Sequence, residues 1–324
     1  MDTKALIRQA RQAVAASSCN SKKLTAIHAG VAAAAGLIVA LLSYLLDSGM
    51  GGTGGLSGIG TRALLETVQS VLSLAVNFLN PFWGLGFVAV TLALARQQHF
   101  SNHTLTAGFR ICWPVLRLVV LEGLLCAAVV IVTTQVGTYL YLISPLSNAA
   151  AALLEQIAAF NPTDSTALLD LMATLDPQVI KAIAWSAIPF LVIPALIALI
   201  PLSYRLRLAQ YLLLDHPKMG AMAAIMLSLR LMKKNCLKLF ALDLRLCWFY
   251  LLEVLVLALS YGDLLLPLVG IGLNSSSVML TFLFYALALV CQVGLYVWQK
   301  PQVMTAYALF YDGLLPREEV RAEA

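Results

Sequence analysis

The sequence has few charged residues. They make up 11 % of its 324 residues, whereas hydrophobic residues make up 60 % and the mean hydropathy is +0.86. A water-soluble domain of this length and composition would carry more apolar side chains than it could bury. The scarcity of charge therefore excludes an ordinary soluble domain and predicts a protein whose outer surface is covered by lipid.

Catalytic and disulfide motifs are also missing. None of the six cysteines forms a CxxC pair, and no GxSxG, HExxH or Walker A sequence is present. Residues 49–54 match GxGxxG by letter, but they lie in a glycine-rich stretch after an apolar run and not in a βαβ unit, which is typical of a flexible linker. We expect no enzyme activity, no catalytic residue and no cofactor.

The sequence does contain long apolar runs. A helix needs roughly 20 apolar residues to cross the hydrocarbon core of a bilayer. Six runs fit this requirement, the second together with part of the helix before it: residues 27–46, 82–95, 113–136, 183–206, 246–266 and 278–298. The second and fifth runs have the least defined ends. The pattern predicts an all-α, polytopic transmembrane helix bundle of about six spans with additional interfacial amphipathic helices.

Basic residues gather in alternate connecting segments. Of the 21 Lys and Arg residues, only Arg62 and Lys181 fall on the opposite side of the predicted bundle. Because cationic segments stay cytoplasmic, we expect both termini inside, with a cytoplasmic segment at 1–26, a single integral membrane domain at 27–313 and a cytoplasmic tail at 314–324. The expected partners are the bilayer and its anionic headgroups, not nucleic acid.

Residues 65–80 have the period of an amphipathic helix. Its polar face includes Asn77 and Asn80, and Asn80-Pro81 predicts a point where the helix restarts or kinks. Two interpretations are open. The helix lies in the outer headgroup layer, or its polar stripe lines a water-filled cavity between helices.

A second amphipathic helix is predicted at residues 217–234 on the cytoplasmic side, starting at Pro217. Its methionines and its basic end suit the membrane surface. A groove for a membrane-protein partner or for a second copy of the chain would use the same residues, which are Met219, Met222, Met226, Met232, Arg230, Lys233 and Lys234.

A four-residue match precedes the third and fifth runs. Arg110-Ile-Cys112-Trp113 corresponds to Arg245-Leu-Cys247-Trp248. The match indicates either an internal repeat or the shared preference of Arg and Trp for membrane interfaces.

Two carboxylates lie inside predicted spans. Glu122 follows Trp113 and Glu253 follows Arg245 at spacings that place each roughly 12 to 14 Å into the membrane, at 1.5 Å per residue. Charged groups there are costly. If the two face each other, they share a proton, as a proton-coupled transporter requires. The alternative is a hydrogen bond that joins two helices, with the candidate partners Ser260, Gln292 and Arg117.

His99 and His103 are four residues apart, which is the spacing of one helical face and of a possible metal pair. The segment between them is predicted to be a loop, and no carboxylate or cysteine is close in sequence. We therefore predict no metal site.

A longer pattern begins at residue 188, where a proline-containing run leads into tyrosines, a D-x-P turn and a helix with a Met-Lys pair. Its residues are Ile188-Pro189, Tyr204, Tyr211, Asp215-His216-Pro217, Ser228, Met232-Lys233, Phe240-Ala-Leu242, Trp248, Pro301, Thr305-Ala306 and Phe310-Tyr311, with weaker matches at Ala95-Arg96 and Gly108-Phe109. In this pattern the chain resembles the bacterial membrane-protein family called domain of unknown function 975. The resemblance implies an α-helical multi-pass protein of the bacterial plasma membrane and implies no active site.

Two functions follow from these features. The favoured one is a non-enzymatic membrane scaffold or interaction protein, which predicts a bundle closed by its own side chains. The alternative is a secondary transporter of a small solute or lipid, which predicts a cavity reached by Glu122, Glu253, Asn77 and Asn80.

Overall fold

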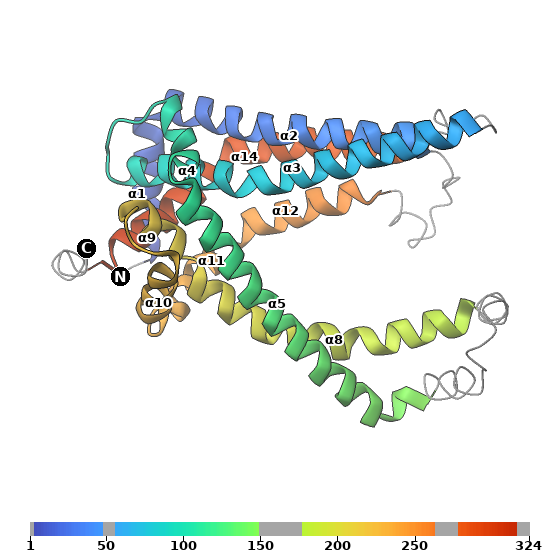
Figure 1. Ribbon diagram of the computed structural model, residues 1–324. Coiled ribbons are helices and arrows are strands. Elements are labelled where there is room, and N and C mark those ends of the chain that lie inside the picture. Colours follow the sequence, from blue (N-terminus) through green and yellow to red (C-terminus); the bar gives the residue numbers. More distant parts are fainter. Residues whose placement is uncertain (1–2, 48–55, 149–176, 263–277, 316–324) are drawn as a thin grey trace. The chain divides into compact units, whose positions relative to one another are not determined.

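The computed structural model describes residues 3–47, 56–148, 177–262 and 278–315, and these residues form helices with no strand among them. They belong to two compact units. The larger unit contains Met1–Val119 and Leu208–Ala324, and the smaller unit contains Val120–Arg207. Figure 1 follows the helices along the chain. The predicted all-α class is confirmed.

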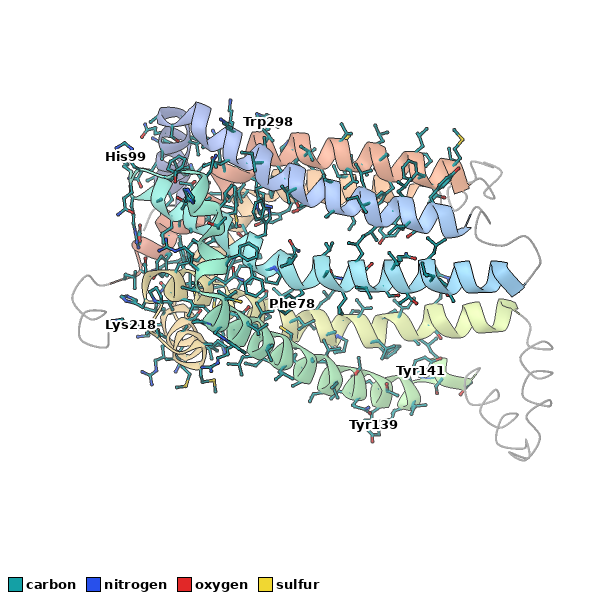
Figure 2. All side chains as sticks on the ribbon, turned by 45° about the horizontal axis from the view of Figure 1, so that its top comes forward. Phe78, His99, Tyr139, Tyr141, Lys218 and Trp298 are labelled. Atoms are coloured by element: carbon teal, nitrogen blue, oxygen red, sulfur yellow. The ribbon has the colours of Figure 1, made fainter. Side chains whose placement is uncertain are left out.

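The larger unit is built around α14 (Val278–Asp312). This helix contacts α1 (Thr3–Ala16), α2 (Ser18–Asp47), α3 (Leu56–Ala95) and α12 (Cys247–Ser260). Figure 1 shows α2, α3 and α14 side by side. We call one end of this unit the base; it consists of α1, the adjoining ends of α3 and α14, and the short helices η1 (Asn102–Thr106), α4 (Ala107–Arg110), α9 (Ala209–Asp215), α10 (Ala221–Met232) and α11 (Cys236–Arg245). His99 and Lys218 mark the base in Figure 2.

Among the described residues, five helices are long and apolar enough to cross a membrane: Ser21–Tyr44, Ala63–Ala95, Cys112–Ile143, Trp185–Asp215 and Met279–Asp312. They coincide with five of the six predicted spans. The remaining prediction, residues 246–266, corresponds to α12, an apolar helix of 14 residues, and residues 263–266 lie outside the described part. Large apolar side chains such as Leu74, Ile131 and Ile197 are exposed on the long helices. Association with a membrane gives these side chains an apolar environment.

Two helices differ from prediction near a proline. α3 continues through Pro81 as one helix of 40 residues, so the predicted restart at Asn80 is wrong, whereas the alternative of a kink there stays a prediction. Proline removes one backbone hydrogen bond, and a long helix that packs against neighbours tolerates that loss. α10 begins after its N-cap Gly220 and not at Pro217, because the preceding residues form a turn in which the Met219 N–H donates to the His216 carbonyl at 2.9 Å.

Two glycines set the packing of α3 against the segment that follows it. A Cβ atom at Gly86 would overlap the carbonyl oxygen of Leu105 in η1, and a Cβ atom at Gly108 in α4 would overlap the carbonyl oxygen of Phe82 in α3. Leu105 and Phe82 are themselves buried. The two backbones therefore touch where side chains are absent, as small residues permit in membrane proteins.

The two Arg-x-Cys-Trp sequences share a local backbone form. In each, a short helix ends at the arginine and the next helix begins at the cysteine, so that one residue, Ile111 or Leu246, breaks the helix. Trp113 and Trp248 are both exposed just after this break. The correspondence thus extends from the letters to the backbone of this junction.

The N-terminal helix α1 was not predicted. Leu6, Ala10 and Val14 are buried at a spacing of four residues, and α1 contacts α14 and α3. This spacing is the signature of an amphipathic helix, and it was available in the sequence. Part of the segment expected to be a cytoplasmic extension is therefore packed into the base.

The smaller unit contains the second part of α5 (Cys112–Ile143), η2 (Pro145–Ser147) and α8 (Pro177–Leu206). Its two long helices meet at Gly137, where a Cβ atom would overlap the carbonyl oxygen of Phe190. The Tyr141 ring packs edge-on against Phe190 with centroids 5.7 Å apart, and its hydroxyl lies 3.0 Å from Ser186 Oγ. A close backbone approach, an aromatic pair and a hydrogen bond therefore join α5 to α8.

Candidate functional site

A cluster of charged side chains lies in the base, where three helices end. Arg96 follows the last residue of α3, Asp215 ends α9 and Asp312 ends α14. Arg96 Nη1 and Nη2 donate to Asp215 Oδ1 and Oδ2, both at 2.7 Å. Nη2 also donates to Asp312 Oδ1 at 2.7 Å, and Nε donates to the same oxygen at 3.1 Å. One guanidinium thus joins the ends of three helices through charge-assisted hydrogen bonds.

Tyr311 completes the cluster. Its hydroxyl donates to Asp215 Oδ2 at 2.9 Å, and its ring stacks on Tyr211 with centroids 5.3 Å apart. The side chain of Arg96 is 29 % exposed and that of Asp215 is 14 % exposed. The hydrogen bonds to Asp215 raise the pKa of Arg96 well above its ordinary value, so the guanidinium stays charged while it is partly shielded from water.

Tyrosines of α14 donate to carboxylates from three other helices. The pairs are Tyr296 with Glu253 of α12, Tyr307 with Asp243 of α11, and Tyr311 with Asp215 of α9. The oxygens of the first pair are 2.8 Å apart. Positions 296, 307 and 311 fall on one side of a helix with 3.6 residues per turn. This side of α14 is therefore a line of hydroxyl donors that binds the neighbouring helices.

Two basic side chains lie among aromatic rings near the first of these pairs. Lys300 Nζ is 3.9 Å from the ring centroid of Tyr296 and 5.5 Å from that of Phe87. His28 is buried and stacks on Phe87 with centroids 4.7 Å apart. Among the described residues, His28 Nδ1 has no hydrogen-bond partner. Aromatic faces thus surround a cation and an imidazole inside the bundle.

A groove of about 530 Å³ lies between α12 and α14. Glu253 and Gln292 line it together with the rings of Tyr250, Tyr261 and Tyr285, and most of the remaining lining is aliphatic. Glu253 therefore both joins two helices and faces an open space.

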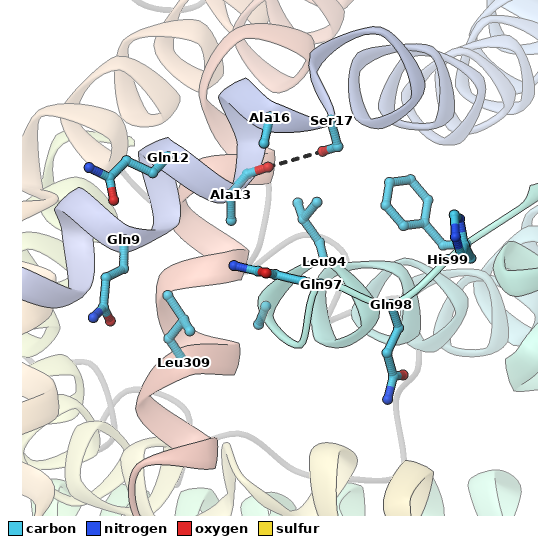
Figure 3. Close-up of a pocket in the computed structure, with 12 residues that line it drawn as sticks. Gln9, Gln12, Ala13, Ala16, Ser17, Leu94, Gln97, Gln98, His99 and Leu309 are labelled. Atoms are coloured by element: carbon cyan, nitrogen blue, oxygen red, sulfur yellow. Dashed lines mark hydrogen bonds between the residues drawn. The ribbon is translucent and has the colours of Figure 1, made fainter.

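A second hollow of about 790 Å³ lies in the base between α1 and the ends of α3 and α14. Four glutamines and His99 line it: Gln9, Gln12, Gln97 and Gln98. Figure 3 shows the Gln97 side chain directed between α1 and Leu309, whereas Gln98 points away from α1. Gln97 has a positive φ of 56°, which turns the chain at the end of α3. The hollow offers neutral amide groups and no carboxylate among its described lining residues.

A protein-family description, "Protein of unknown function (DUF975)", matches residues 28–318 of the chain. The chain belongs to DUF975. The resemblance predicted from the sequence pattern is thereby confirmed. No curated protein and no solved structure matches the chain.

Most of the residues that carried the DUF975 resemblance are packed in the base or beside it. Arg96, Asp215 and Tyr311 form the charged cluster, and Gly108 makes the close contact with α3. Others have side chains that are at most 3 % exposed: Tyr211, Ser228, Met232, Leu242, Thr305, Ala306 and Phe310. Seven residues of the pattern differ because they are exposed: Phe109, Ile188, Pro189, Pro217, Lys233, Phe240 and Trp248. The DUF975 pattern therefore mainly describes how the base is held together.

The predicted glutamates belong to different units of the DUF975 chain. Glu253 accepts a hydrogen bond from Tyr296 on a neighbouring helix, in the way the joining interpretation predicts, although its partner is not one of the three candidates. Glu122 lies on α5 in the smaller unit, and its Oε1 is buried with no hydrogen-bond partner among the described residues. A pairing of Glu122 with Glu253 stays a prediction.

Only part of the predicted polar stripe of α3 makes hydrogen bonds to another helix among the described residues. Asn77 and Asn80 are exposed, and their role in lining a cavity stays a prediction. Gln69, eight residues before Asn77 on the same helix, donates to Ser43 Oγ of α2 at 2.7 Å. His99 and His103 are both exposed, and the described residues contain no group of three or more side chains suited to hold a metal ion.

The charged cluster itself was not predicted. Arg96 and Asp215 belong to the family pattern, whereas the sequence pattern assigns no role to Asp312 or Asp243. The available signal was that single charges of opposite sign stand at the ends of apolar helices, namely Arg96 after α3 and Asp312 at the end of α14. Such charges are costly near lipid unless they are paired.

Proposed function

We propose that this protein is a non-enzymatic, multi-pass protein of the bacterial plasma membrane that acts through contacts made by its base on the cytoplasmic side. The observation that carries the proposal is that the charged side chains of the base bind one another. Arg96 is bound by Asp215 and Asp312, and Asp215 also accepts from Tyr311. A substrate or metal ion at this cluster would have to displace partners that the fold already supplies.

The exposed side chains of the base support a contact role. α10 and α11 present large apolar side chains to their surroundings: Met222, Met226, Leu237, Phe240 and Leu244. Basic residues stand beside them at Arg230, Lys233, Lys234 and Lys238, and all four are exposed. Apolar side chains flanked by cations suit the boundary of a membrane that contains anionic lipid. Anionic headgroups of the inner leaflet are the partner that we propose.

The emission of a fluorescent label on α10, measured in vesicles of different lipid composition, tests this proposal. Met226→Cys, introduced into a variant without other cysteines and labelled with the environment-sensitive fluorophore NBD, is reconstituted in vesicles of phosphatidylcholine with or without phosphatidylglycerol. We expect a shift of emission to shorter wavelength with the anionic lipid, and loss of the shift in Lys233→Glu/Lys234→Glu. A label at the exposed Asn102 serves as control. Identical emission from position 226 in both lipids would contradict the proposed partner.

Transport is the second candidate function, and one observation favours it. Glu253 lies on an apolar helix and faces the groove between α12 and α14. A carboxylate that borders an open space in such a helix is typical of a site for a proton or solute in transporters. Solute-linked proton flux that is lost in Glu253→Gln would favour this function over the first.

A further inference from the structure

We propose that the groove between α12 and α14 binds a lipophilic organic cation, with Glu253 as its counter-ion and tyrosine rings as its walls. This inference goes beyond the contact role of the base, because the groove lies on other residues and its occupation requires no partner at α10 or α11. It assigns a ligand class to this groove.

The size and the lining of the groove fit a small ligand with a large apolar part. Its volume of about 530 Å³ is within the range of small-molecule sites, roughly 300 to 1,000 Å³. Val254, Val256, Leu257 and Leu289 supply aliphatic contacts. Val254 is 64 % exposed and Leu257 58 % exposed, so this wall is reached from the surface of the larger unit.

The polar groups of the groove select for positive charge. Glu253 is the acidic residue among the described lining residues, which include no lysine, arginine or histidine. Three phenol rings also line the groove, those of Tyr250 and Tyr261 on the α12 side and of Tyr285 on α14. The faces of aromatic rings attract cations, and the attraction grows where water is excluded. Lys300 interacts electrostatically with Glu253 but does not line the groove, so an anion in the groove would meet the Glu253 carboxylate with no cation among the lining residues.

The fold itself contains a cation held by the same kind of group. The ammonium of Lys300 lies 3.9 Å from the ring centroid of Tyr296, and the hydroxyl of that tyrosine donates to Glu253 at 2.8 Å. An aromatic ring coupled to this carboxylate thus already stabilises a positive charge. The groove likewise presents tyrosine rings and the Glu253 carboxylate to a molecule from outside.

Equilibrium binding of tetraphenylphosphonium to the full-length protein in lipid nanodiscs tests the proposal. We expect saturable binding that weakens at least tenfold in Glu253→Gln. Glu66→Gln is the matched control, because it removes a carboxylate from α3 of the same unit that does not line the groove, and its affinity is expected to equal that of the parent protein. Neutral triphenylphosphine oxide, which has similar rings and no net charge, is expected to bind much more weakly.

A pair of substitutions at an exposed position separates binding from folding. Tyr261 is 57 % exposed, so its replacement leaves the packing of the bundle intact. Tyr261→Leu is expected to weaken binding of tetraphenylphosphonium several-fold, whereas Tyr261→Phe keeps the ring and the affinity. Equal affinity in the parent and Glu253→Gln, or equal binding of the neutral compound, would overturn the proposal. Neither result would change the lipid-dependent signal from α10, so failure of this proposal is distinguishable from failure of the contact role.

Discussion

Arg96 binds Asp215 with both terminal nitrogens of its guanidinium at 2.7 Å, although 119 positions separate the two residues in the sequence. The geometry is bidentate, which gives an arginine and carboxylate pair both strength and a fixed orientation. Because Asp312 binds the same guanidinium, the end of α3 is fixed to α9 and to α14 together. We therefore expect the packing of the base to depend on this one side chain.

Removal of Arg96 tests that dependence. Arg96→Ala leaves two carboxylates without their cation, and we expect a loss of about 2 kcal/mol, below the range for fully buried pairs because the side chains are partly exposed. Arg96→Lys keeps the charge without the planar fork and should lie between the parent and the alanine variant. Thermal unfolding of the purified protein in detergent measures the effect. Arg230→Ala, at an exposed position of α10, should change stability by no more than about 0.5 kcal/mol.

Loss of the Tyr311 hydroxyl separates its hydrogen bond from its packing. Tyr311→Phe keeps the ring that stacks on Tyr211 and removes the donor to Asp215, so we expect a loss of about 1 kcal/mol in unfolding free energy. Tyr139→Phe is the control, because Tyr139, which belongs to α5, is 66 % exposed and its side chain points outward from that helix in Figure 2. Equal stability of the two variants would show that the Tyr311 hydroxyl does not contribute.

Methyl groups at the close backbone contacts of α3 should disrupt the base. Gly86→Ala and Gly108→Ala place a Cβ atom against a carbonyl oxygen, and overpacking of this kind costs about 1 to 3 kcal/mol or more. Gly84→Ala, two residues away on the same helix, meets no atom within 4 Å. It should be neutral or stabilising, since alanine favours helix more than glycine does. The unfolding temperatures of the three variants measure these effects. Equal temperatures for Gly84→Ala and Gly86→Ala would contradict the close contact between Gly86 and Leu105.

The smaller unit allows the same comparison. Gly137→Ala would force α5 away from Phe190 of α8, whereas Gly123→Ala on the same helix meets no atom within 4 Å. We expect faster hydrogen exchange in α8 of the first variant and no change in the second, because local opening follows the loss of packing contacts. Unchanged exchange in Gly137→Ala would indicate that α5 and α8 are not held at this position.

The long helices were predictable because an apolar run is a local property of the sequence. The runs at 27–46, 113–136, 183–206 and 278–298 became α2, α5, α8 and α14. The uninterrupted path of α3 through Pro81 was not predictable in the same way, because the helix is retained by packing against α2, α14 and η1. Local signals report propensity, and tertiary contacts override them.

The charged cluster required information that no local pattern contains. Arg96 and Asp312 are 216 positions apart, and neither is distinguished from other charges near the ends of apolar runs. The family pattern named Arg96, Asp215 and Tyr311 without indicating that they touch. The intramembrane glutamates were predictable from their position in apolar runs, whereas the partner of Glu253, Tyr296, follows only from the packing of α12 on α14.

Proton flux in proteoliposomes tests most directly whether the protein acts through contacts and not through transport. Purified parent protein, Glu253→Gln and Arg230→Ala are reconstituted with a pH-sensitive dye inside, and a panel of small solutes that includes tetraphenylphosphonium is added outside. We expect the same flux in parent vesicles as in empty vesicles for every solute, even where a cation binds. Solute-linked flux in the parent that is retained in Arg230→Ala and lost in Glu253→Gln would contradict it and identify a transporter.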